Sequence, residues 1–427
     1  MSEHFIINGG KPLTGTVRVQ GYKNSAGALL AATLLTEEEC IIEDLPLIVD
    51  IVNMVKVLES LGVEVEWLDD RRVKIKSGAN IEATKMDFEK AQLTRISVLF
   101  IGALLSRLQK FKIARPGGDK IGLRPISTHL DALKQLQVSY TQEDGFYYFK
   151  RGLIEDEERE IVLQEFSVTA TENLLLASVL VPGKTVLKGV AAEPQVQDLI
   201  SMLNKMGAKI KGSGTHTLEI EGVEKLHGTK HQVVSDPLVA GTYLIAGAVT
   251  PGRLKVENVV PDHLTLFLEK LKTMGVNLEI GEDNIEVDYC PNPQPVDVQA
   301  MPYPGFPTDL LPIIVPLITQ AEGKVLIHDP LYENRLGYVD ELRKMGADIE
   351  RVDPHRAFIF GKSELQGATI QSSDIRAGAS LVLAALMASG QTKITHIHQI
   401  DRGYENIEEN LQKLGADIKR IKNNNNK

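Results

Sequence analysis

A helix-to-strand unit recurs six times along this 427-residue chain, about once every 70 residues. In each copy, a Leu or Met pair runs into a pivot residue and then into an alternating strand pattern. The pivots are Gly62, Gln137, Gly207, Gly275, Gly346 and Gly415. Because glycine adopts the left-handed backbone at no steric cost, we expect each pivot to end a helix. Six units in a chain of this length predict two domains of three units each.

Two further patterns accompany each unit. The first is a pair of alternating segments around a Gly-rich turn, which we interpret as a β-hairpin; the clearest copies begin at Phe5, Leu218 and Phe358, and looser ones begin near Val73, Phe146 and Ile285. The second is a helix that is apolar on all sides, at residues 25–35, 95–105, 171–181, 240–250, 309–319 and 377–387. Such helices must be buried, whereas the helices before the pivots are amphipathic. The sequence therefore predicts an α/β fold with helices inside and sheets outside.

Composition narrows the class of protein. Hydrophobic residues make up 43% of the chain and the net charge is -10, which argues against a nucleic-acid surface. The apolar runs are short and interrupted, as at Pro312 and Pro316, and the first ten residues lack a signal-peptide pattern, so we expect a cytoplasmic protein without membrane insertion. Cys40 and Cys290 have no metal-ligand spacing and are expected to be reduced structural thiols.

Polar residues gather just before the predicted helices. They are Lys23, Asn24, Arg95, Ser167, Asp236, Asp309, Asp374 and Arg376 before the apolar helices, and Arg124, Arg335 and Arg402 before the amphipathic ones. Helix capping alone would explain the Asp and Ser residues. A cation at a helix N-terminus opposes the macrodipole, so the repeated Lys and Arg predict a bound anion, although a single such Arg would be an ordinary solvated side chain.

The segment ARPGGDKIGLRP, residues 114–125, contains a Gly pair between two prolines. This composition is typical of a mobile loop with stiff ends, so we predict a lid; an ordinary surface loop is the alternative.

Seven segments resemble those of the enolpyruvyl transferases, in the same order and over nearly the whole chain: QGYKNSAGALL, ARPGGDKIGLRPISTHL, SVTATENLLLA, GFPTDL, YENRLGYVDEL, SDIRAGASLVLA and IDRGYENIEE. The resemblance implies two inside-out α/β barrel (prism) domains, each built from three repeats, with the active site in the cleft between them. Residues 1–20 with 233–427 would form one domain, and residues 21–232, carrying the lid, the other. A monomer would suffice.

The resemblance also implies an activity. The enolpyruvyl group of phosphoenolpyruvate would pass to the sugar 3-hydroxyl of UDP-N-acetylglucosamine by addition and elimination, releasing phosphate and starting peptidoglycan precursor synthesis. Neither a cofactor nor a metal is implied. Two alternatives stay open: the family member that uses 3-phosphoshikimate, and a catalytically weak or silent protein that binds UDP-N-acetylglucosamine.

Roles for individual residues follow from the same resemblance. Lys23, Arg124 and Arg402 would contact the phosphate of phosphoenolpyruvate, with Arg335 and Arg376 near its carboxylate. Asn24, Arg95, Pro125, His129, Ser167, Val168, Asp309, Leu331 and Asp374 would complete the substrate-binding set, mostly on the sugar-nucleotide side. Asp309 would act as the base for the sugar hydroxyl, and Asp119 in the lid would carry the proton to the vinyl methylene.

The chain departs from the family pattern at several positions. Asp119 replaces a frequent Cys, and Thr169 replaces a usual Gly. Pro237 and Val239 stand where Arg and Glu are typical, and Leu311 and Pro312 where a Gln is expected. These changes are the reason for keeping a weakly active paralogue as an alternative.

Overall fold

The computed structural model describes residues 3–118 and 121–422. These residues divide into two compact units. The C-terminal unit contains residues 3–20, 121–123 and 235–422, and the middle unit contains residues 21–118 and 124–234.

The C-terminal unit has three four-stranded sheets. Their strand orders are β21 (Thr369–Gln371), β22 (Gln391–Thr395), β1 (Glu3–Asn8), β23 (Asp417–Lys422); β15 (Leu278–Ile280), β16 (Asn284–Asp288), β14 (Arg253–Glu257), β2 (Gly15–Arg18); and β17 (Val298–Gln299), β18 (Gly323–His328), β20 (Arg356–Gly361), β19 (Asp348–Arg351). Its helices are α8 (Pro237–Val249), α9 (Thr265–Thr273), α10 (Leu311–Ile318), α11 (Val339–Lys344), α12 (Ile375–Met387) and α13 (Ile407–Lys413), with 3-10 turns η4 (Pro261–Leu264), η5 (Thr308–Leu310), η6 (Arg335–Tyr338) and η7 (Ile397–Arg402).

The middle unit also has three sheets. Their orders are β11 (Lys209–Lys211), β12 (Thr217–Glu221), β10 (Gly183–Lys188), β9 (Glu157–Val162); β13 (Lys230–Gln232), β3 (Glu39–Glu43), β5 (Val73–Lys76), β4 (Glu64–Trp67); and β6 (Lys110–Ala114), β8 (Phe146–Arg151), β7 (Val138–Glu143). Its helices are α1 (Lys23–Ala32), α2 (Val49–Ser60), α3 (Phe88–Leu93), α4 (Phe100–Arg107), α5 (Ser127–Lys134), α6 (Val168–Ser178) and α7 (Pro194–Lys205), with 3-10 turns η1 (Thr33–Leu35), η2 (Ala83–Lys85) and η3 (Arg95–Leu99).

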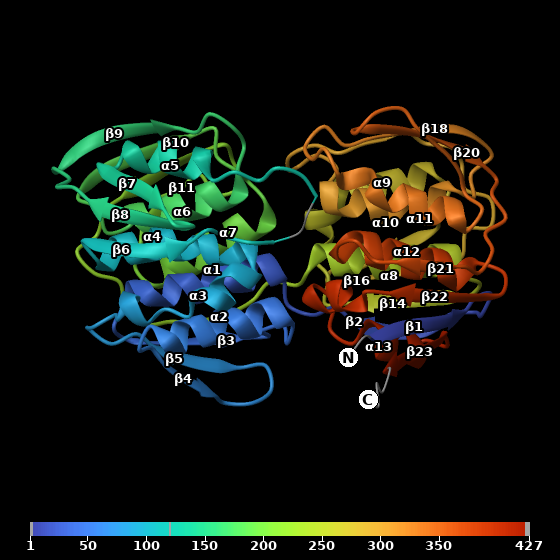
Figure 1. Cartoon of the computed structure of the whole chain (residues 1–427), viewed down its shortest axis with the longest axis horizontal. Coiled ribbons are helices and arrows are strands. Elements are labelled where there is room, and N and C mark those ends of the chain that lie inside the picture. Colours follow the sequence, from blue (N-terminus) through green and yellow to red (C-terminus); the bar gives the residue numbers. More distant parts are fainter. Residues whose placement is uncertain (1–2, 119–120, 423–427) are drawn as a thin grey trace. The chain divides into compact units, whose positions relative to one another are not determined.

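The apolar helices form the core of each unit. In the C-terminal unit, α8, α10 and α12 pack against one another, and every residue of α8 and α10 is buried. Figure 1 shows the sheets of β18 and β20 and of β1 and β22 on opposite sides of these helices. In the middle unit, α4 packs on α6 and on α1. The predicted burial of the apolar helices is therefore confirmed in both units.

All six pivots adopt the left-handed backbone that the repeat predicts. The φ angles are 86° at Gly62, 55° at Gln137, 100° at Gly207, 89° at Gly275, 97° at Gly346 and 110° at Gly415. Each follows an amphipathic helix and precedes a strand, so the predicted helix-to-strand switch is confirmed six times. Gln137 takes this conformation although it is not glycine.

The prediction of hairpins at Phe5, Leu218 and Phe358 is wrong. β1 pairs with β22 and β23, whereas β2 joins a different sheet beside β14. In the same way, β13 leaves the sheet of β12 and β21 leaves that of β20. The second strand of each segment runs parallel to its new neighbour at a sheet edge. The Gly-rich turn of each segment therefore carries the chain from one sheet to the next. Strand alternation alone cannot distinguish such a crossing from a hairpin.

Candidate active site

Asp309 lies between two buried arginines of the C-terminal unit. Arg335 Nη2 donates to Asp309 Oδ1, and Arg376 Nε donates to Asp309 Oδ2 at 3.1 Å. Arg335 Nε also donates to the Thr308 carbonyl at 3.4 Å. The two arginines are 2% and 3% exposed, while the Asp309 side chain is 31% exposed. Of these three side chains, Asp309 is therefore the most exposed.

Capping separates Asp309 from the other predicted acids. Asp236 accepts from the Leu238 and Val239 amides, and Asp374 accepts from the Arg376 and Ala377 amides in the first turn of α12. Ser167 likewise caps α6. Capping is confirmed for those three residues, whereas no side-chain cap forms at the start of η5 or α10. Asp309 is thus the member of the set whose position the helix terminus does not explain.

The two arginines determine the charge of Asp309. Burial raises the pKa of this carboxyl, but the attraction of Arg335 and Arg376 is stronger and holds the pKa well below its usual range. Arg335 Nη1 also lies 3.9 Å from Asp374 Oδ1. Asp309 is consequently ionised and, with both oxygens accepting from guanidinium groups, a weak base.

The predicted residue Leu331 lies on an exposed loop that is tied to the same cluster. Its amide donates to Asp329 Oδ1 at 2.9 Å, and its side chain is 41% exposed. Asp329 is fully buried and also accepts from the Thr308 hydroxyl, next to Asp309. Asp329 was not predicted, and it fixes the Leu331 loop relative to the Asp309 turn.

Arg402 ends η7, and Nη1 donates to Gln399 Oε1 at 3.1 Å. Two residues later, the Tyr404 ring lies 5.2 Å from the guanidinium carbon of Arg376. Its hydroxyl bonds Thr242 Oγ1 at 2.8 Å. The Arg402 segment is therefore packed against the cluster of Arg376.

Lys23 opens α1 in the middle unit and is paired with a buried acid. Its Nζ lies 2.7 Å from Asp50 Oδ2, and the two side chains are 8% and 2% exposed. Asp50 also accepts from Thr94 Oγ1 at 3.2 Å. Sequence reasoning missed Asp50, although a lone charge in the apolar run LPLIVDIVNMV is a detectable signal.

Three other predicted residues of the middle unit lie on neighbouring segments. Arg95 Nη2 donates to the Pro125 carbonyl at 3.2 Å. A Cβ on Gly118 would lie 2.9 Å from Arg95 Cβ and 3.4 Å from Arg124 Nη1. Arg95, Arg124 and Pro125 therefore come together around Gly118. Asn24 makes a separate contact, since its Nδ2 donates to the Tyr22 hydroxyl at 3.5 Å.

His129 is a neutral, deeply buried member of the predicted set. Its Nε2 lies 2.8 Å from Thr169 Oγ1, next to Val168 at the start of α6. Burial lowers the pKa of His129 to about 3, and the charge of Arg95 adds to this effect. His129 Nδ1 has no hydrogen-bond partner among the described residues. The unusual Thr169 thus bonds a predicted substrate residue.

The structure describes only part of the segment predicted to be a lid. Asp119 lies outside the described residues. A Cβ on Gly117 would meet the Gln92 carbonyl oxygen at 1.9 Å, and Gly118 has a φ of 123°. Close packing and backbone conformation therefore account for both glycines, and lid motion stays a prediction.

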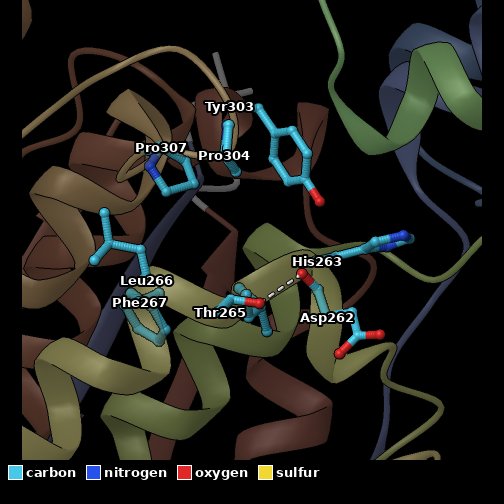
Figure 2. Close-up of a pocket in the computed structure, with 10 residues that line it drawn as sticks. Asp262, His263, Thr265, Leu266, Phe267, Tyr303, Pro304 and Pro307 are labelled. Carbon is cyan, nitrogen blue, oxygen red and sulfur yellow. Dashed lines mark hydrogen bonds between the residues drawn. The ribbon is translucent and has the colours of Figure 1, made fainter. Parts of the chain in front are cut away.

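A pocket in the C-terminal unit lies between η4 and the turn before Asp309. Figure 2 shows Tyr303 directed toward Asp262 and His263, with Thr265 Oγ1 donating to the Asp262 carbonyl at 2.9 Å. None of the predicted substrate residues lines this pocket. Pro307, two residues before Asp309, does line it. Within residues 3–118 and 121–422, no cluster of three or more His, Cys, Asp or Glu could hold a metal, and no helix is long and apolar enough to cross a membrane.

Comparison with known proteins identifies the family. The model of the EPSP synthase family (3-phosphoshikimate 1-carboxyvinyltransferase) matches residues 7–411. The chain belongs to this enolpyruvyl transferase family. The predicted resemblance is therefore confirmed.

Individual relatives refine the comparison. Proteins named UDP-N-acetylglucosamine 1-carboxyvinyltransferase include one from Koribacter versatilis, 44% identical over 98% of this chain and 96% of its own length. One from Coxiella burnetii is 40% identical over the same shares of both chains. Among solved structures, the enolpyruvyl transferase NikO from Streptomyces tendae has a TM-score of 0.89 at 25% identity, covering 98% of this chain and 99% of that one. EPSP synthase from Acinetobacter baumannii has a TM-score of 0.75 at 20% identity, covering 99% of this chain and 100% of that one, and supports the fold alone.

Proposed function

We propose that this protein transfers the enolpyruvyl group of phosphoenolpyruvate to the 3-hydroxyl of UDP-N-acetylglucosamine and releases phosphate. The observation that carries the proposal is the match, at 40–44% identity over nearly the whole chain, to proteins named for this reaction. The arrangement around Asp309 supports the proposal. Arg335 and Arg376 are suited to bind an anionic substrate, and Asp309 is suited to act as the base for a hydroxyl group.

The carboxylate of phosphoenolpyruvate is the ligand proposed for Arg335 and Arg376. Both arginines are preorganised by burial and already bind one carboxylate, that of Asp309. A second carboxylate would compete with Asp309 for the same guanidinium donors. Phosphoenolpyruvate would thus draw hydrogen bonds away from Asp309 and make its carboxylate a better base.

Asp309 would then accept the proton of the sugar hydroxyl as its oxygen attacks C2 of phosphoenolpyruvate. A second proton, for which Asp119 is the proposed carrier, would reach the C3 methylene and give a tetrahedral ketal. Loss of a methyl proton with cleavage of the C–O bond to phosphate would complete the transfer. Lys23, Arg124 and Arg402 are proposed to stabilise the phosphate charge as it leaves.

The sugar nucleotide is proposed to contact the set on the middle unit. His129 would act there as a neutral hydrogen-bonding group, because its pKa of about 3 excludes a charged imidazole near neutral pH. Its Nδ1 atom is buried and, within the described residues, has no hydrogen-bond partner. Arg95 is the cation of this set suited to the phosphate oxygens of the nucleotide.

Four of the departures from the family pattern lie in two helices of the C-terminal unit. Pro237 and Val239 lie in the first turn of α8, where Asp236 caps the helix, and Leu311 and Pro312 are buried in α10. These four residues are part of the helical core of the C-terminal unit. A silent binding protein is therefore the less favoured proposal.

Phosphate release tests the function. Purified protein is supplied with phosphoenolpyruvate and either UDP-N-acetylglucosamine, 3-phosphoshikimate or no acceptor. We expect phosphate only with UDP-N-acetylglucosamine, and we expect Asp309→Asn to abolish most of it. Release with 3-phosphoshikimate instead would assign the chain to the other branch of the family, and binding of UDP-N-acetylglucosamine without release would favour the silent alternative.

A further inference from the structure

Arg420, on the last strand of the C-terminal unit, binds three carboxylates at once. Its Nη1 and Nη2 atoms contact both oxygens of Asp401, at 3.0 and 2.6 Å. Its Nε and Nη2 atoms donate to the two oxygens of Glu408, and Nη1 donates to Glu3 Oε2 at 2.8 Å. The guanidinium also lies over the Phe5 ring, 5.1 Å from its centre.

This geometry differs from that of an ordinary surface ion pair. The Arg420 side chain is 19% exposed and Glu408 is 9% exposed, so solvent screens the interaction incompletely. Two bidentate contacts and a ring fix the guanidinium plane as well as its position. Isolated exposed pairs contribute little, but a shared and partly buried fork of this kind restricts the segments that it joins.

The two acids Asp401 and Glu408 lie on either side of Arg402 in the chain. Asp401 immediately precedes Arg402 at the end of η7, and Glu408 lies in the first turn of α13. Gln20 fixes the chain between them, since its Nε2 donates to the Gly403 carbonyl at 3.2 Å and its Oε1 accepts from the Glu405 amide at 2.9 Å.

We propose that Arg420 is a positioning residue for Arg402 in the reaction with phosphoenolpyruvate. By engaging Asp401 and Glu408, it holds the backbone on both sides of Arg402. Without Arg420, the contacts that hold Asp401 and Glu408 in place would be lost, and the segment that carries Arg402 would be less restricted. The inference rests on the proposed function, because it assumes that Arg402 contacts that phosphate.

Steady-state kinetics with both substrates test this role. Arg420→Gln should lower kcat/KM for phosphoenolpyruvate by about tenfold to a hundredfold, the loss expected when a catalytic group is displaced by about 1 Å. The KM for UDP-N-acetylglucosamine should stay unchanged, because the residues proposed for it lie on other segments. Arg420→Lys should recover part of the loss, since lysine restores the charge without the planar fork.

Arg253 is the matched control. It lies on β14 of the same unit and also bridges carboxylates, with Nη2 2.8 Å from Glu279 and 2.7 Å from Glu286. No predicted substrate residue adjoins these acids in the chain. Arg253→Gln should leave the kinetic constants for both substrates unchanged.

A double variant separates the inference from the proposed function. If Arg420 acts through Arg402, then Arg420→Gln should weaken phosphoenolpyruvate binding much less in the Arg402→Ala background than in the wild type. Equal losses in the two backgrounds, or an unchanged kcat/KM in folded Arg420→Gln protein, would overturn the positioning role. Full phosphoenolpyruvate use by Arg402→Ala would instead overturn the assigned role of Arg402. Should Arg420→Gln not fold, Asp401→Asn weakens the same link, and the same two results decide.

Discussion

At the scale of single residues, three buried cations of the candidate site are paired with carboxylates of the protein itself. Lys23 is paired with Asp50, and Arg335 and Arg376 share Asp309. The sequence argument that cations at helix starts need an external anion is therefore incomplete for these three, because internal acids meet part of the need. Asp50 could not be assigned to Lys23 from sequence, since the two residues lie 27 positions apart and on different helices.

Asp309→Asn tests the competition at the arginines. The amide cannot carry the negative charge that attracts Arg335 and Arg376, so phosphoenolpyruvate should bind at least as tightly as to the wild type. Turnover should fall by about a hundredfold or more, because the base is lost. Calorimetric titration and phosphate release measure the two effects. Weaker phosphoenolpyruvate binding would show that Asp309 does not compete with the substrate.

His129 makes the stability of the middle unit depend on pH. Its folded-state pKa is about 3 and its ordinary value is 6.5, so between these pH values the unfolded chain binds the additional proton. Stability is unaffected above pH 6.5 and should fall by about 1.4 kcal/mol per pH unit below it. His129→Gln removes this contribution. Denaturant unfolding at about pH 7.5 and about pH 5.5 should therefore show a smaller acid loss than in the wild type.

The exposed His227, in the same unit, supplies the control for that comparison. His227→Gln should keep the wild-type pH dependence. If His129→Gln also keeps the wild-type pH dependence of stability, the His129 imidazole is not buried in its neutral form as described above.

At the scale of elements, the sequence predicted the helices and their ends better than the pairing of strands. The six apolar helices are recognisable because no face is polar, and the pivots because left-handed backbone favours glycine. Strand partners depend on residues far apart in the chain. The turn after β1, for example, resembles a hairpin turn in composition, yet β2 pairs with β14. Local alternation contains no information about that choice.

Gln137 offers a test of the pivots, since it adopts a φ of 55° at a site where five repeats have glycine. Gln137→Gly should stabilise the protein by about 0.5–1 kcal/mol, because a Cβ is disfavoured in this conformation. Gln135, with a φ of -69°, is the control, and Gln135→Gly should be destabilising. A loss of stability in Gln137→Gly, measured by denaturant unfolding, would contradict the cap assignment.

Gly102 tests the packing of α4 on α6. Its amide donates to Asn173 Oδ1 at 2.6 Å, and an added Cβ would lie 2.3 Å from the Asn173 carbonyl oxygen. Because backbone cannot move aside cheaply, Gly102→Ala should cost about 1–3 kcal/mol. Gly78 has open space around it and negative φ, so Gly78→Ala should be nearly neutral. Equal unfolding midpoints for the two variants would show that the helices pack less closely than described.

At the scale of the whole molecule, some sheets combine strands that lie far apart in the sequence. β1 lies between β22 and β23, so the first strand of the chain is an inner strand of a sheet otherwise formed by its last residues. The repeat count predicted two sets of three units, but it could not show that a strand is exchanged between successive sheets. The candidate site was predicted mainly from the family resemblance, whereas Asp50, Asp329 and Arg420 emerged only from three-dimensional contacts.

The central claim is that this chain joins an enolpyruvyl group to UDP-N-acetylglucosamine, and the identity of the product tests it most directly. Protein is incubated with both substrates, and the sugar nucleotide is recovered and analysed by mass spectrometry. We predict a product heavier by one enolpyruvyl group, with phosphate released in equal amount and the new ether on the sugar 3-oxygen. Recovery of unmodified UDP-N-acetylglucosamine from protein that binds both substrates would contradict the account.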